Sequence, residues 1–171
     1  MAWVTLSLGS SLNPQQNINS CLDALLLQFK DLSLSSVFES ESVGFKGDNF
    51  LNMVVGVNTD LALPDLSTLL KDIEDKHGRD RSSPKFSGRT LDIDILTYDD
   101  LAGEFHGITL PRGEITENAF VLWPLSQICA RQKHPVLGKS FADLWQGYDR
   151  DSQKLWPVDF TWHGRMISKA K

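Results

Sequence analysis

Cysteine is scarce in this chain, which has only two, and neither lies near a pair of histidines. This scarcity excludes the ligand spacing of a zinc site and the CxxC motif of a dithiol redox centre. Long apolar runs are also missing, since no stretch approaches the ~20 residues of a membrane-spanning helix. The first residues lack the basic leader and apolar core of a signal peptide. We therefore expect a cytoplasmic protein with no membrane partner.

Basic residues are outnumbered by acidic ones, with 17 Lys and Arg against 22 Asp and Glu and a formal net charge of -5. An acidic protein has no general attraction to nucleic acid, so we expect no nucleic-acid partner. The apolar fraction of 41% and the charged fraction of 23% are ordinary for a soluble globular protein. Residues 1–171 fit one domain, with a core over about 2–147 and an unassigned tail over 148–171.

The spacing of apolar residues predicts alternating strands and helices. Strands are expected at 2–8, 32–38, 50–59 and 90–98, and helices are expected to begin at Pro14 and Pro64. The order β-α-β-β-α-β is that of a ferredoxin-like fold of the α+β class, in which helices pack on one face of an antiparallel sheet. Short helical additions are predicted around 118–128 and 141–145.

Two carboxylates alternate with apolar residues in the segment LDIDI, which contains Asp92 and Asp94. On a strand, both carboxylates then point to the same face, with their backbones roughly 6.5–7 Å apart. Such a pair can converge on Mg²⁺, which takes oxygen ligands and often bridges phosphates. A D-x-D segment alone is more typical of the solvated face of an edge strand, so the neighbouring segments decide its interpretation.

Four cations lie just upstream of the carboxylate pair, at Arg79, Arg81, Lys85 and Arg89. The planar guanidinium of arginine donates parallel hydrogen bonds to phosphate oxygens. Phosphoryl and pyrophosphoryl transfer rest mainly on positioning and charge neutralisation, so arginines beside metal-binding carboxylates favour this chemistry. Taken alone, the segment is also compatible with a solvated basic loop.

An aromatic ring and an amide lie at alternate positions in the segment FLN, which contains Phe50 and Asn52. On a strand, both side chains face the same way, so they can stack on a flat heterocycle and hydrogen bond to its edge. Without further context, the pair is more typical of a buried ring and a polar residue near a turn.

Four sequence blocks, in this order, resemble the pterin pyrophosphokinases of folate biosynthesis: F-L-N, I-E-x-x-x-G-R-x-R, G-R-T-L-D-I-D-I-L and F-V-L-W-P-L. The opening L-G-S-S-L-N is similar to the G-S-N-L start of that family. The resemblance runs from about residue 3 to about residue 147. It implies a ferredoxin-like core, a 6-hydroxymethyl-7,8-dihydropterin substrate, and ATP with two Mg²⁺ ions as the pyrophosphate donor.

The resemblance also implies roles for individual residues. The metal ligands are Asp92 and Asp94. The catalytic residues are Arg79, Arg89 and Asp94. The pterin-binding residues are Ser40, Val43, Phe50, Asn52, Phe86, Asp92 and Phe120. The nucleotide-binding residues are Glu74, Arg81, Lys85, Arg89, Ile95 and Arg112.

Several positions on the nucleotide side depart from the family pattern. After Pro111 the family usually has His-Tyr, where this chain has Arg112 and Gly113, and a family arginine is replaced by Asn118. Phe86 also has a smaller stacking area than the tryptophan usual there. Each lost charge-assisted hydrogen bond costs about 1.5–3 kcal/mol, so ATP binding is expected to be weaker unless Arg112 compensates.

Other functions share parts of this pattern. A diverged relative could bind a pterin with weak or no pyrophosphate transfer, or act on a different small heterocyclic alcohol. A single-stranded RNA-binding module can have the same strand order, but the paired aspartates and the net charge argue against it. We expect a monomer whose partners are ATP and a reduced pterin.

Overall fold

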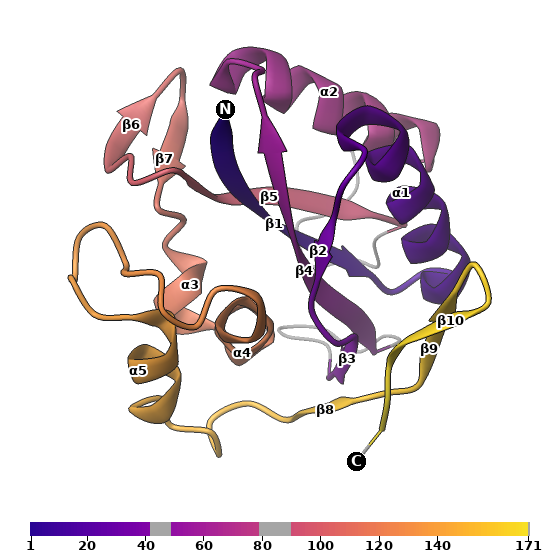
Figure 1. Cartoon of the computed structure of the whole chain (residues 1–171). Coiled ribbons are helices and arrows are strands. Elements are labelled where there is room, and N and C mark those ends of the chain that lie inside the picture. The colour runs from indigo at the N-terminus through magenta and orange to yellow at the C-terminus, as the bar shows by residue number, and fades with distance from the viewer. Residues whose placement is uncertain (42–48, 79–89, 171) are drawn as a thin grey trace.

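The protein is described by a computed structural model that covers residues 1–41, 49–78 and 90–170. Its main sheet is antiparallel, has six strands, and has the order β5-β1-β4-β3-β8, with β2 also paired to β4 (Figure 1). In chain order, the first part is β1 (Ala2–Ser10), α1 (Pro14–Phe29), β2 (Ser33–Leu34), β3 (Phe38–Ser40), β4 (Phe50–Thr59), α2 (Leu63–Lys76) and β5 (Asp92–Tyr98). This order confirms the predicted α+β, ferredoxin-like core.

The second part of the chain adds helices and short strands to this core. It comprises β6 (Gly103–Phe105), β7 (Ile108–Leu110), α3 (Glu114–Glu117), α4 (Ala119–Ile128), α5 (Phe141–Gln146), β8 (Leu155–Pro157), β9 (Phe160–Trp162) and β10 (Arg165–Ser168). The helices α4 and α5 confirm the predicted C-terminal helical additions. Among the described residues, no helix is both long and apolar enough to cross a membrane.

The larger core lies between the sheet and the helices α1 and α2 (Figure 1). Helical spacing places Ile18, Leu22 and Leu25 on one face of α1, and all three are fully buried. They pack in the same cluster as Leu6 and Val55 of the sheet. Burying each such side chain contributes about 1.5–3 kcal/mol, which holds α1 to this face.

A second core lies on the opposite face of the sheet, where the prediction had placed no helix. There Val54 and Leu96 pack against the apolar side of α4, which includes Val121 and Leu125. The run FVLWPL of α4 is apolar around most of its circumference, which suits a helix that contacts the sheet on one side and α5 on the other. Helix α4 therefore covers part of this face and leaves the neighbouring part to the polar residues described below.

Three predicted strands differ in extent from the observed ones, and the one predicted at 90–98 begins at Asp92. The other two differ because pairing partners override local sequence. Strand β1 continues through Gly9 to Ser10, since both residues pair with β4 and Gly9 also pairs with β5. The predicted strand 32–38 is divided into β2 and β3. At the division, Ser35 Oγ accepts a hydrogen bond of 2.8 Å from the backbone N–H of Val54.

The tail, which the sequence left unassigned, adds an edge strand and a hairpin to the fold. Strand β8 pairs with β3, so that Leu155 lies opposite Ser40. The hairpin β9–β10 lies beside α1, where Asp23 Oδ1 accepts a hydrogen bond of 2.9 Å from Trp162 Nε1 (Figure 1). The tail is thus attached to both the sheet and α1.

Candidate functional site

The two predicted metal ligands lie on edge strand β5 and face away from the larger core. Ile93 and Ile95, which alternate with them, are each only 7% exposed and pack beneath α1 and α2. Asp92 and Asp94 therefore point to the other face, and the side chain of Asp94 is 37% exposed. The alternation predicted from the sequence holds in the structure.

A row across three strands connects Asp92 to Asn52 through Gly9. Gly9 of β1 pairs with Asn52 on one side and with Asp92 on the other. With strands about 4.8 Å apart, the backbones of Asn52 and Asp92 are separated by about 10 Å. A Cβ atom at Gly9 would lie 3.4 Å from Asn52 Oδ1 and 3.9 Å from Phe50 Cδ1. Because Gly9 has no side chain, none stands between the amide of Asn52 and the carboxylate of Asp92 in this row.

The amide of Asn52 is held in one orientation by its neighbour on β3. Asn52 is 4% exposed, and its Nδ2 donates a hydrogen bond of 2.8 Å to Ser40 Oγ, which is itself buried. Its carbonyl oxygen therefore lies on the side of Gly9. Three predicted pterin-binding residues, Ser40, Phe50 and Asn52, thus lie together on one face.

Arg112 lies beside the carboxylate pair. Its backbone N–H donates a hydrogen bond of 2.9 Å to the carbonyl of Leu96, which fixes the loop before α3 against β5. Its Nη2 lies 3.6 Å from Asp94 Oδ1 and 2.8 Å from Glu114 Oε1. Burial lowers the pKa of Arg112, but the charges of Asp94 and Glu114 outweigh burial and raise it overall. The guanidinium is therefore a fixed positive charge next to Asp94.

Phe120 lies in the first turn of α4 and lines a cavity of about 430 Å³ together with Ser40. The rest of that lining comes from Glu41 and from residues 151–155 of the tail. The position predicted to stack on a pterin is thus open to a cavity that also contains a second predicted pterin residue.

Two predicted nucleotide contacts have their side chains on the opposite side of β5. Glu74 is 6% exposed, and its Oε2 accepts a hydrogen bond of 2.8 Å from the backbone N–H of Ile93, between the two aspartates. The side chain of Ile95 is buried in the larger core. The structure does not bring the side chains of Glu74 and Ile95 to the face of β5 that carries Asp92. Glu74 instead holds β5 in place through its hydrogen bond to Ile93.

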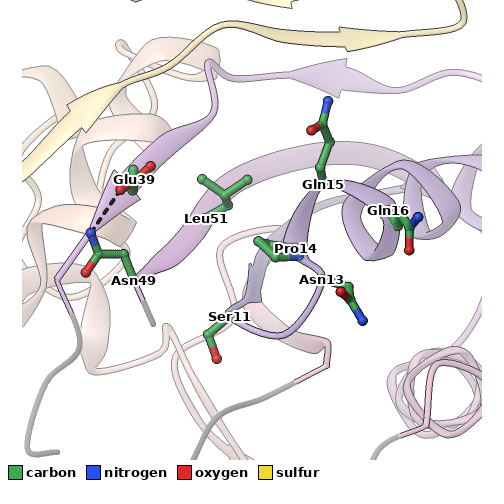
Figure 2. A pocket seen from close by; sticks show the side chains of 8 residues that line it. All are labelled: Ser11, Asn13, Pro14, Gln15, Gln16, Glu39, Asn49 and Leu51. Carbon is green, nitrogen blue, oxygen red and sulfur yellow. Dashed lines mark hydrogen bonds between the residues drawn. The ribbon is translucent and has the colours of Figure 1, made fainter. Parts of the chain in front are cut away.

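A further cavity of about 640 Å³ lies at the start of α1 and contains none of the predicted site residues. Figure 2 shows its side chains, which come from the turn before α1 and the first residues of that helix, from β3, and from β4 and the residue before it. Leu51 there packs with the larger core, so this cavity opens on the other side of the sheet from Asn52. A hydrogen bond of 2.9 Å from Asn49 Nδ2 to Glu39 Oε2 crosses its wall.

With this geometry, comparison with known proteins decides the family. Residues 5–130 match the model of the 7,8-dihydro-6-hydroxymethylpterin-pyrophosphokinase (HPPK) family. The chain belongs to the HPPK family. It is 32% identical over 151 residues to the 2-amino-4-hydroxy-6-hydroxymethyldihydropteridine pyrophosphokinase of Synechocystis sp., covering 83% of this chain and 76% of the relative. It is 33% identical over 148 residues to the enzyme of that name in Aquifex aeolicus, covering 84% and 91%.

Solved HPPK structures share the fold of this chain. An HPPK-DHPS in complex with substrates superposes with a TM-score of 0.73 at 12% identity, over 98% of this chain and 48% of that one. A wild-type Plasmodium falciparum HPPK-DHPS with pteroate gives a TM-score of 0.70 at 14% identity, over 98% and 47%. The chain thus spans about half the length of these HPPK-DHPS chains. Family membership confirms the resemblance drawn from the sequence blocks.

Several residues whose site roles were predicted from the sequence resemblance lie outside the described residues, and these roles stay predictions. They are Val43, Arg79, Arg81, Lys85, Phe86 and Arg89. Sequence reasoning also missed two residues at the site. Glu114 follows Arg112 by two positions, a spacing that could have indicated an ion pair. Gln153 belongs to a segment beyond the HPPK match, and no local pattern indicated its contacts with α4.

Proposed function

We propose that this chain transfers pyrophosphate from ATP to 6-hydroxymethyl-7,8-dihydropterin and releases AMP. The observation that carries the proposal is the row Asn52–Gly9–Asp92, which places an amide and a carboxylate on either side of a glycine, with Arg112 next to Asp94. Family membership supports the same reaction, because relatives covering most of this chain carry the name of that pyrophosphokinase.

The pterin would lie over Gly9. A pterin is a flat heterocycle with N–H donors along one edge, and Asn52 Oδ1 is an acceptor on the side of Gly9. Ser40 prevents the amide from rotating, because its Oγ accepts the hydrogen bond from Asn52 Nδ2. Phe50 and Phe120 supply aromatic surfaces for one side of the ring.

Asp92 and Asp94 suit Mg²⁺ because they offer only oxygen ligands. Across residues 1–41, 49–78 and 90–170, no three His, Cys, Asp or Glu side chains form a metal-binding group. A pair of carboxylates is nevertheless enough for Mg²⁺, which completes its coordination with water and phosphate oxygens. Asp92 and Asp94 would hold Mg²⁺, which supplies neutralisation of phosphate charge and lowers the pKa of a nearby hydroxyl group.

In the transfer step, the pterin hydroxymethyl oxygen forms a bond to the β-phosphorus of ATP. The bond from that phosphorus to the oxygen shared with the α-phosphate breaks, AMP leaves, and the hydroxyl proton passes to solvent. Arg112 would bind an ATP phosphate from its position beside Asp94, with Glu114 orienting its guanidinium. Arg79 and Arg89 would neutralise the charge that develops on the transferred group.

AMP release tests this proposal directly. Purified protein is incubated with ATP, Mg²⁺ and 6-hydroxymethyl-7,8-dihydropterin, and AMP is followed with and without the pterin. AMP that forms only when the pterin is present supports the reaction. Pterin binding measured by calorimetry without any AMP would overturn it in favour of a pterin-binding relative. AMP formed with another heterocyclic alcohol but not with this pterin would show that the other alcohol, rather than the pterin, is the substrate.

A further inference from the structure

Residues 151–155 of the tail form one wall of the cavity that contains Ser40 and Phe120. The HPPK family model ends at residue 130, so nothing in the family match assigns a role to this segment. Within it, Gln153 is half-buried, whereas its neighbours Ser152 and Lys154 are exposed. The burial of Gln153 reflects contacts with the start of α4.

Gln153 makes two hydrogen bonds to the first residues of α4. Its Oε1 accepts a hydrogen bond of 2.8 Å from the backbone N–H of Ala119, and its Nε2 donates one of 2.9 Å to Asn118 Oδ1. Asn118 is the residue before the helix, but its side chain does not cap the helix. An amide from 34 residues further along the chain therefore does what a capping side chain normally does.

The segment that carries Gln153 is fixed at both ends. Upstream, Tyr148 stacks on Trp145, and its hydroxyl donates a hydrogen bond of 2.7 Å to the carbonyl of Glu117. Downstream, Leu155 pairs with Ser40 in the sheet. Gln153 is therefore held at a set distance from both the beginning of α4 and the strand that carries a predicted pterin residue.

Phe120 follows directly after the residue that Gln153 caps. The direction of a side chain in the first helical turn depends on whether that turn is formed, and an uncapped first turn frays. Asn118 Nδ2 also donates a hydrogen bond of 3.2 Å to Glu114 Oε2, so the amide of Gln153 belongs to the same hydrogen-bonded group as Glu114. Loss of the two Gln153 hydrogen bonds would therefore change the orientation of the Phe120 ring before it affects residues further along α4.

We propose that Gln153 is a positioning residue that sets the ring of Phe120 against the pterin and so contributes to pterin affinity. The proposal rests on the proposed function, because it takes Ser40 and Phe120 as residues that bind the pterin. It assigns to the tail a part in substrate binding that the family match does not cover.

Two substitutions at Gln153 separate this role from general stability. Gln153→Leu keeps the volume and removes both hydrogen bonds, so KM for the pterin should rise roughly five- to tenfold, while KM for ATP stays within about twofold. Gln153→Glu keeps an acceptor for the Ala119 N–H at a helix N-terminus, where negative charge is favourable, but it loses the donor to Asn118 Oδ1, so it should restore part of the pterin affinity. Gln146→Ala, in an exposed glutamine at the end of α5, is the matched control and should change neither constant.

Hydrogen exchange provides a readout that does not depend on turnover. Amides at the start of α4 should exchange faster in Gln153→Leu than in the unaltered protein, and Gln153→Glu should restore protection. Equal KM values for the pterin in Gln153→Leu and the unaltered protein would overturn the inference and leave the proposed function standing. A fall in kcat with equal rises in both KM values would also overturn it, because that result indicates a structural role. Failure of the unaltered protein to bind the pterin would overturn the proposed function, and this inference with it.

Discussion

Asp94 can lose its charge without disturbing the core, because its carboxylate lies on the face of β5 opposite Ile93. Asp94→Asn should reduce pterin-dependent AMP release by about 100-fold or more, since the metal would lose a charged ligand. The melting temperature should stay within about 2 °C. Asp100→Asn, in an exposed turn, is the control. Turnover close to normal in Asp94→Asn would contradict the metal-ligand assignment.

Arg112 stands where the family usually has histidine, and its place beside Asp94 supports a role in ATP binding. Arg112→Ala should raise KM for ATP by roughly tenfold or more, with a smaller effect on KM for the pterin, because a charge-assisted hydrogen bond to phosphate is lost. Steady-state kinetics in which each substrate is varied separately measures both constants. Arg131→Ala removes an exposed arginine as a control. An unchanged KM for ATP would show that Arg112 does not compensate for the family residues missing here.

His134 makes the stability of the protein depend on pH. Its Nδ1 accepts hydrogen bonds from the backbone N–H groups of Val136 and Leu137, and burial lowers its pKa below the ordinary 6.5. A lowered pKa means that the unfolded chain binds more protons than the folded one. The contribution of neutral His134 to the free energy of unfolding is therefore complete above pH 6.5 and is lost as pH falls through the folded-state pKa.

The free energy of unfolding in urea should therefore fall as pH decreases below 6.5. In His134→Asn, an amide oxygen can accept the same hydrogen bonds without titrating, so the decrease should be smaller. An identical pH dependence in the two proteins would exclude His134 as its source.

Among the elements, the helices and the long strands were predictable because their apolar periods are local. Ile18, Leu22 and Leu25 indicate a buried face of α1 without reference to any other segment. The division between β2 and β3 was not predictable, because it depends on a hydrogen bond between Ser35 and Val54. Asp92 and Asp94 could be assigned to one face from alternation. Their distance from Asn52 depends on strand order, which only the fold supplies.

The row across β4, β1 and β5 predicts an unusual effect at Gly9. A Cβ atom there meets no atom closer than 3.4 Å, so Gly9→Ala should fold normally and can be compared directly with the unaltered protein. The added methyl group would stand between Asn52 and Asp92, where the pterin is proposed to lie, and pterin affinity should fall roughly tenfold while the melting temperature is maintained or rises. Calorimetric titration with the pterin measures the affinity, and Gly147→Ala, outside the row, is the control. Unchanged pterin affinity would place the pterin elsewhere.

In the whole molecule, the tail adds an edge strand to the sheet, and Ser168 joins the tail to the residue just before β3 by a hydrogen bond. Ser168 is 4% exposed, and its Oγ accepts a hydrogen bond of 2.9 Å from the backbone N–H of Val37. Ser168→Ala would leave that buried N–H without its acceptor, so the free energy of unfolding should fall by about 1–3 kcal/mol. Urea denaturation measures the change, and Ser33→Ala, at an exposed serine of β2, should alter it by less than about 0.5 kcal/mol. Equal effects of the two substitutions would contradict this role of Ser168.

The pairing of β8 with β3 has a consequence for the synthesis of the protein. Ribosomes release residues 38–40 well before residues 155–157, so each nascent chain passes through a stage in which β3 has no partner on its outer side. An unpaired strand edge can join other chains and start aggregation. A slow codon between α5 and β8 would prolong this stage, and a premature stop codon there would leave β3 without this partner. The yield of folded protein therefore depends on how quickly translation passes through this interval.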